Sequence, residues 1–233
     1  MEICNRTGLE SLSENNGIKI LDEADKKIYS VGISTGGLAE IRMVTNEPER
    51  YVIATTIDPE GAEYAKHRIK ALGLSDQIAV KIEDVTESLP YQDGYFDYIY
   101  ARLVLHYLPK DALSSALAEL YRILRTGGKM FTVVRSVECL EAGDKNAQFD
   151  AHTCLTTYFS AGKSYSRYFH SQESIQRHLS SAGFSIKHLL TYQEQLCTDF
   201  QRTKPAGQID SLIEVLVVKN AFEIKKNLMT QFF

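Results

Sequence analysis

Short β-branched apolar segments alternate with segments of helical periodicity over the first half of the chain. Apolar strands are predicted at 28–33, 51–58, 77–84, 95–103 and 129–136. Amphipathic helices are predicted at 37–44, 59–72 and 111–124, and Pro59 is well placed as the first helical residue of the second one. This alternation predicts a parallel sheet with helices on both faces.

The pattern changes after residue 136. Residues 137–170 are polar, aromatic and irregular, and a segment of this length is more typical of a lid than of a plain connection. Ser171 is a candidate N-cap for a helix at 171–184, which two strands follow at 185–196 and 211–220. We expect a single domain made of an N-terminal cap (1–27), a core (28–136), a lid (137–170), a C-terminal helix with two strands (171–220) and a tail (221–233).

Composition and charge are those of an ordinary globular protein. The chain has 233 residues, of which 44% are hydrophobic and 24% charged, so it can bury a core without disulfides or metals. Its apolar runs are too short to span a bilayer and its first residues lack a signal pattern, which predicts a cytoplasmic protein without a membrane partner. The net charge of −4 argues against nucleic acid as a partner. Four widely spaced cysteines indicate reduced thiols.

Two features at the predicted strand ends suggest a ligand site. Gly32, Gly36 and Gly37 permit a sharp turn after the first strand and a close approach of backbone to ligand. A tight turn without a ligand is one alternative; a nicotinamide site is another, because Gly32, Ser34 and Gly37 occupy the three positions of a GxGxxG fingerprint. Asp58 ends the second strand, where a carboxylate either binds both hydroxyls of a ribose or caps the next helix.

An ordered set of motifs follows in the next part of the chain. They are Asp84, Leu89-Pro90-Tyr91, Phe96-Asp97, Leu103 to His106, and Leu124 to Gly127-Gly128. In this order and spacing they resemble the class I S-adenosylmethionine-dependent methyltransferases, and within them the group called methyltransferase type 11. The resemblance covers about residues 28–136, and 168–219 at the level of strand pattern. It implies a Rossmann-like α/β fold with a seven-stranded, mostly parallel sheet, an antiparallel last strand and helices on both faces.

The family uses S-adenosylmethionine as its methyl donor and releases S-adenosylhomocysteine, and the resemblance implies which residues bind it. Asp58 would hold the ribose hydroxyls, and Asp84 would contact the adenine amino group. Val85 and Pro59 would lie on opposite faces of the adenine ring, although simple packing is the alternative for both.

The same resemblance places Gly32, Ile33, Ser34 and Gly36 along the methionine part of the cofactor. Arg102 would lie near the sulfonium and the substrate entrance. The family pattern begins with an acid that helps to orient the amino end of the cofactor. Ser30 stands at that position here, and Ser34 replaces the middle glycine of the turn. These departures favour, as an alternative, a noncatalytic protein that keeps the fold.

His106 is the candidate catalytic base, with Arg102 beside it, because methyl transfer to oxygen usually needs a base and histidine titrates near neutrality. The alternative is a histidine that closes an apolar turn. No second His/Cys pair accompanies His152 and Cys154, which predicts no structural metal.

Aromatic and basic side chains gather in and after the predicted lid. They are Tyr158, Phe159, Tyr165, Tyr168 and Phe169, with Lys163, Arg167, Arg177 and Lys187. They suggest a small-molecule substrate that is acidic or aromatic. A satellite aromatic core and a solvated basic surface are the alternatives.

Overall fold

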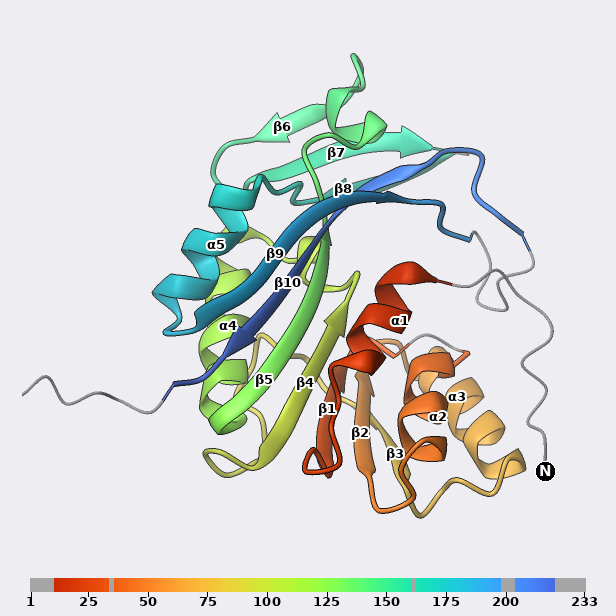
Figure 1. Ribbon diagram of the computed structural model, residues 1–233. Helices are drawn as coiled ribbons and strands as arrows, with labels where there is room; N and C mark the ends of the chain where they lie inside the picture. The colour runs from red at the N-terminus through yellow and green to blue at the C-terminus, as the bar shows by residue number, and fades with distance from the viewer. Residues whose placement is uncertain (1–10, 34–35, 161, 198–203, 221–233) are drawn as a thin grey trace, which may run out of the picture.

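A computed structural model describes residues 11–33, 36–160, 162–197 and 204–220 (Figure 1). The first ten residues of the expected cap, the turn residue Ser34 and the tail 221–233 lie outside the described residues. The main sheet has seven strands in the order β3-β2-β1-β4-β5-β10-β9. Their bounds are β1 Lys27–Val31, β2 Tyr51–Thr56, β3 Ile78–Ile82, β4 Phe96–Arg102, β5 Leu124–Arg135, β9 Ser185–Glu194 and β10 Asp210–Val218.

The strand directions confirm the predicted sheet. β1, β2, β3, β4 and β5 pair in parallel, whereas β10 lies antiparallel between β5 and β9. The order reverses at β1, which pairs with β2 on one side and β4 on the other. Ligands of open α/β sheets bind outside the carboxyl ends of the strands at such a reversal.

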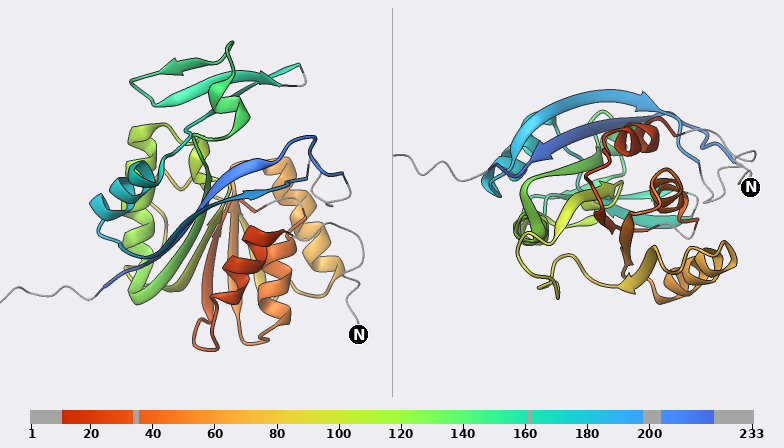
Figure 2. Two further views of the ribbon diagram at one scale, coloured as in Figure 1. Left: turned by 45° about the horizontal axis from the view of Figure 1, so that its top comes forward. Right: turned by 60° about the horizontal axis from the view of Figure 1, so that its bottom comes forward.

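Helices cover both faces of the sheet, as predicted (Figure 2). One apolar cluster joins the sheet to α1 (Leu12–Lys19), α2 (Leu38–Thr45) and α3 (Pro59–Ala71). The other joins it to α4 (Lys110–Ile123) and α5 (Gln172–Ser181). In α4 the fully buried side chains of Leu113, Leu117 and Leu120 recur every three or four residues, so the amphipathic pattern has determined which face of this helix meets the sheet.

The helix α1 is part of the expected N-terminal cap and packs very closely on the sheet. The hydroxyl of Tyr98 donates to the carbonyl of Gly17 at 2.8 Å. A Cβ built on Gly17 would lie 2.6 Å from the Tyr100 ring and 2.7 Å from Phe131, so only glycine permits this approach. None of the helices in the described part of the chain is long and apolar enough to cross a bilayer.

The Phe96-Asp97 motif joins three strands at their amino ends. One carboxylate oxygen of Asp97 accepts the backbone N–H groups of Lys26 and Lys27 at 3.0 and 2.8 Å, where β1 begins. The other accepts from Nε of Arg125 on β5 at 2.7 Å. The motif therefore fixes the strand alignment on which the opposite, carboxyl edge depends.

Two predictions about local structure were wrong. The strand expected at 129–136 begins at Leu124, directly after α4, because Leu124 already pairs with Phe96. The segment 137–170 is not irregular: it holds a 3-10 helix η2 (Leu140–Gly143) and a three-stranded antiparallel sheet of β6 (Gln148–Asp150), β7 (Leu155–Ser160) and β8 (Lys163–Arg167). β6 has only three residues, and β7 and β8 are short and rich in Ser and Thr, so the two-residue alternation of apolar and polar positions is weak. We call this small sheet and η2 the lid; it lies beyond the carboxyl ends of β4 and β5 (Figure 1).

Candidate functional site

The glycine turn leaves β1 with a backbone that only glycine adopts easily. Gly32 is exposed and has φ +76°, and a Cβ built there would lie 2.7 Å from Cγ2 of Val104. The N–H of Ile33, whose side chain is buried, donates to the carbonyl of Thr55 at 2.7 Å and ties the turn to β2. Gly36 is buried, and Gly37, with φ +54°, precedes the first residue of α2. The predicted sharp turn is present at the described positions.

Asp58 follows β2 and is the N-cap of α3. One carboxylate oxygen accepts the N–H of Glu60 at 3.1 Å, which is a helix cap. The other lies beside Gly61, where a Cβ would be 2.6 Å away. The carboxylate is exposed, as is Pro59 after it. Capping uses one oxygen and leaves the other at the surface, so the two interpretations of Asp58 are compatible.

After β3 the sequence offers two adjacent acids, and the structure separates their roles. The Glu83 carboxylate accepts the hydroxyls of Tyr29 and Tyr91 at 3.0 and 2.7 Å. Asp84 is exposed, and its Oδ1 accepts the N–H and the hydroxyl of Thr86 at 2.9 and 2.7 Å. Glu83 is therefore engaged in the protein, whereas Asp84 is presented at the strand end.

The loop after Asp84 is fixed by α4. Glu119 accepts the N–H of Leu89 at 2.6 Å, and Arg122 donates to the carbonyls of Leu89 and Tyr91 at 3.0 and 2.6 Å. Val85 is buried in the same apolar cluster as Leu89. Because the side chain of Val85 packs in this cluster, only its backbone can contact a ligand at the strand end.

These elements meet along one edge of the sheet. β3, β2 and β1 are neighbours and run in parallel, so Asp84, Asp58 and Gly32 follow the carboxyl ends of three adjacent strands. Two exposed carboxylates beside a bare glycine backbone suit a ligand with hydroxyl and amino donors at one end and a compact chain at the other. The residues present therefore fit an adenosyl cofactor.

Arg102, the last residue of β4, is turned toward α1. Its Nε donates to the Ser13 hydroxyl at 2.7 Å, its Nη2 donates to the Ser11 hydroxyl at 2.8 Å, and Glu194 of β9 lies 3.8 Å away. The Ser11 hydroxyl donates in turn to Glu194 at 2.7 Å. In this arrangement Arg102 attaches α1 to the sheet.

His106 lies in the 3-10 helix η1 (Leu105–Tyr107) that follows β4, and only 1% of it is exposed. Burial, with the nearby charges of Arg167 and Arg135, holds the pKa of His106 well below its ordinary value. Its Nδ1 is buried and has no hydrogen-bond partner among the described residues, whereas its carbonyl accepts the N–H of Tyr168 at 2.7 Å. Burial therefore favours the neutral form of the ring and lowers its basicity.

The lid meets η1 through Arg167. The guanidinium carbon of Arg167 lies 5.4 to 5.5 Å from the ring centroids of Tyr107, Tyr158 and Tyr165. Its Nε is buried and has no partner among the described residues. Arg177, by contrast, is exposed on α5. Among the expected basic residues, Arg167 is thus the one that the lid turns inward.

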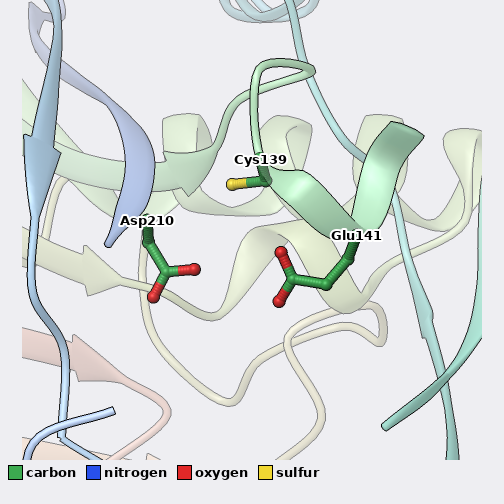
Figure 3. Close-up of side chains that lie close together, drawn as sticks. All are labelled: Cys139, Glu141 and Asp210. Carbon is green, nitrogen blue, oxygen red and sulfur yellow. The ribbon is translucent and has the colours of Figure 1, made fainter. Parts of the chain in front are cut away.

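Cys139, Glu141 and Asp210 form one group with ligand atoms close enough for a metal ion, at the base of the lid (Figure 3). Among the described residues, the guanidinium of Arg135 already supplies a positive charge to this group. Nη1 of Arg135 donates to Glu141 at 3.0 Å and also to Asp210. The Cys139 thiol donates to a backbone carbonyl, and burial raises its pKa. The group is best described as an internal ion cluster around Arg135.

A hollow of about 490 Å³ lies at the other end of the sheet, before β1 and β2. It is lined by charged side chains of both signs, among them Lys19, Asp22, Arg42 and Arg50. Arg50 donates to three backbone carbonyls there. The hollow is far from the glycine turn and Asp58, so it does not belong to the site at the strand ends.

One group at the glycine turn was missed by sequence reasoning. Glu40 of α2 is buried, and the Ser30 hydroxyl donates to its Oε1 at 2.5 Å. The pattern that predicted an amphipathic helix at 37–44 gave no sign of an inward glutamate. Ser30 at the strand end, where an acid is expected, was the signal that could have led to it.

Comparisons with known proteins agree with this geometry. Residues 29–132 match the family model described as a methyltransferase domain. A demethylmenaquinone methyltransferase of Bacteroides fragilis is 31% identical over 45% of this chain and 41% of its own length. One of Thermus thermophilus is 24% identical over 74% of this chain and 80% of its own length.

A solved structure has the same fold. It is that of an S-adenosylmethionine-dependent methyltransferase from Methanosarcina mazei, with a TM-score of 0.66 and 17% identity, covering 91% of this chain and 99% of that one. The chain spans less than half the length of the Bacteroides relative. Residues 29–132 of the chain are therefore similar to a methyltransferase domain, and the chain as a whole has the fold of the Methanosarcina protein.

Proposed function

We propose that this protein transfers the methyl group of S-adenosylmethionine to a small molecule. The observation that supports this most directly is the alignment of Gly32, Asp58 and Asp84 behind three adjacent parallel strands. When bound, the cofactor supplies an electrophilic methyl carbon on a sulfonium. The protein then has to align the acceptor with that carbon, which is chiefly a matter of positioning.

The proposed roles of the binding residues follow from their exposure. The surface oxygen of Asp58 accepts the ribose hydroxyls while its other oxygen caps α3. Asp84 accepts the adenine amino group beside the Val85 backbone, and Pro59 covers the other face of the ring. Gly32, Ile33 and Gly36 line the methionine part, for which the bare backbone of the exposed Gly32 leaves room.

His106 and Arg102 are proposed to position the elements around the active site. A neutral histidine of low pKa accepts a proton poorly, so His106 is better suited to position η1 and the substrate than to act as a strong base. Arg102 holds α1 beside the strand ends. An acceptor that is already nucleophilic, or ionised, fits such a site best.

The lid is proposed to select an acidic or aromatic substrate. Support comes from the inward Arg167, whose buried Nε has no partner among the described residues, and from the half-exposed ring of Tyr107 beneath it. In a thermal-shift screen of aromatic carboxylic acids and their neutral amides, we expect stabilisation by the acids alone. Arg167→Ser should abolish that shift, while Arg177→Ser, on the exposed face of α5, should not.

The cofactor proposal is tested by calorimetry with S-adenosylhomocysteine, the product form. A Kd in the micromolar range is expected for S-adenosylhomocysteine. Transfer of the methyl group from S-adenosylmethionine to an acceptor would then distinguish an enzyme from a noncatalytic protein with the same fold. Binding of NADH alone would instead favour a nicotinamide oxidoreductase, and binding of neither would refute the assignment. We further propose a cytoplasmic location with reduced thiols and no nucleic-acid partner, in keeping with the spacing of the cysteines and the net charge of −4.

A further inference from the structure

A buried carboxylate lies directly behind the glycine turn. Glu40 is 3% exposed and Ser30 is 1% exposed, and the Ser30 hydroxyl donates to Oε1 of Glu40 at 2.5 Å. Ser30 precedes the turn on β1, and Glu40 follows it in the first turn of α2. Their hydrogen bond therefore closes the base of the turn that begins at Gly32.

A carboxylate in this position needs compensation for its lost hydration, because burying a charge is costly unless it is paired and hydrogen-bonded. The Ser30 hydroxyl supplies one neutral donor, and the amino end of α2 supplies a favourable dipole. S-adenosylmethionine carries an ammonium group on its methionine part, which is the part expected at Gly32.

We propose that Glu40 supplies the negative charge that holds the ammonium group of the cofactor, and that Ser30 orients its carboxylate. The proposal rests on the proposed function. It also accounts for the serine at the end of β1: the charge expected on the strand is provided from the helix that packs against it. Glu40 is thus a binding residue for the methionine part, and Ser30 is a positioning residue.

The test uses Glu40→Gln, which keeps an acceptor oxygen for Ser30 and a similar volume but removes the charge. Binding is measured by calorimetry for two probes. S-adenosylhomocysteine carries the ammonium group, whereas 5′-methylthioadenosine has the same adenosine and sulfur but no amino-acid part. We expect the variant to bind S-adenosylhomocysteine about tenfold or more weakly, as for loss of a charge-assisted contact, and to bind 5′-methylthioadenosine unchanged.

Two further variants sharpen the result. Glu214→Gln removes another buried glutamate, one that accepts from Asn16 and Tyr192 away from the turn, and should change neither affinity. Adding Ser30→Asp to Glu40→Gln returns a carboxylate to the strand side of the same contact. This double variant should recover most of the lost affinity for S-adenosylhomocysteine.

An equal loss for both probes would mean that Glu40 only holds the turn, and no loss would mean that its charge is not used; either result overturns the proposal. If the wild-type protein binds both probes, such a failure leaves the proposed function standing. If it binds neither, the proposed function fails and this inference with it. Should Glu40→Gln not fold, the wild-type protein still decides the matter: equal affinity for S-adenosylhomocysteine and its des-amino analogue would overturn the proposal.

Discussion

The two oxygens of Asp58 allow its structural and binding roles to be separated by one substitution. Asp58→Ser retains a side-chain oxygen for the N–H of Glu60, because serine is as good an N-cap as aspartate. It removes the second oxygen and the charge. Asp58→Ala removes both functions. The pair therefore differs in the cap alone, while both variants lack the proposed ribose acceptor.

The expected magnitudes are distinct. Loss of the cap in Asp58→Ala should cost about 1 kcal/mol of stability, which lowers the Tm of a chain of this size by about 2–4 °C. Loss of charge-assisted hydrogen bonds to the ribose should cost about 1.5–3 kcal/mol of binding, or about 10- to 100-fold in the Kd for S-adenosylhomocysteine. Asp58→Ser should show the loss of affinity with an almost unchanged Tm.

Thermal unfolding without ligand and calorimetry with S-adenosylhomocysteine measure the two effects. Ser171→Ala is the matched control, since Ser171 caps α5 by accepting the N–H of Ser174 at 3.2 Å, on a helix that holds no proposed binding residue. It should lower the Tm by a similar amount and leave the affinity unchanged. Wild-type affinity in Asp58→Ser would refute the reasoning, because the carboxylate would then act only as a cap.

Three more substitutions test individual contacts. Burial lowers the pKa of His170 to about 3, so the unfolded chain takes up this proton first as the pH falls below about 6.5, and the free energy of unfolding falls by up to about 1.4 kcal/mol per pH unit. In urea titrations, His170→Gln should reduce the loss of stability between pH 7 and pH 5 by about 2 kcal/mol, and an unchanged loss would contradict this role of His170. Gly73 has a φ of +70°, similar to that of Gly32, but nothing lies within 4 Å of a Cβ built on it, so Gly73→Ala should cost about 1 kcal/mol of stability. Gly32→Ala should cost more, because its Cβ would also meet Val104. Equal Tm values for the two variants would contradict this close contact. Arg135→Met should lower the free energy of unfolding by about 3–5 kcal/mol in denaturant titrations, because it leaves the Asp210 carboxylate without its cation. Adding Asp210→Asn should restore part of that stability. EDTA should leave the wild-type Tm unchanged, and a lower Tm with EDTA would indicate a bound metal instead.

The strands of the main sheet and their mostly parallel arrangement could be predicted from the residues alone. Apolar β-branched runs between amphipathic helices leave few alternatives, because a right-handed crossover connects each parallel pair. The motifs around Asp84, Phe96-Asp97 and Gly127-Gly128 then indicated the methyltransferase fold. The glycine turn at Gly32 was predictable because its backbone requires φ values that other residues rarely adopt.

The partners of the polar side chains, by contrast, depend on contacts between segments that are distant in the sequence. Both Glu83 and Asp84 are acids at a strand end, but only packing against Tyr29 and Tyr91 shows that the first is engaged within the protein. The sequence pattern gave no sign that Arg102 would bind the hydroxyl of Ser13, 89 residues earlier, and so attach α1 to the sheet.

The roles of His106 and Glu40 likewise depend on their burial in the folded protein. Burial lowers the pKa of His106, and Glu40 became a candidate binding residue because α2 turns it toward Ser30. The lid strands are defined by their mutual pairing within residues 148–167, which their sequences indicate only weakly. Local periodicity records which residues are apolar, whereas the charge state and the partner of a polar side chain depend on segments that are distant in sequence and adjacent only after folding.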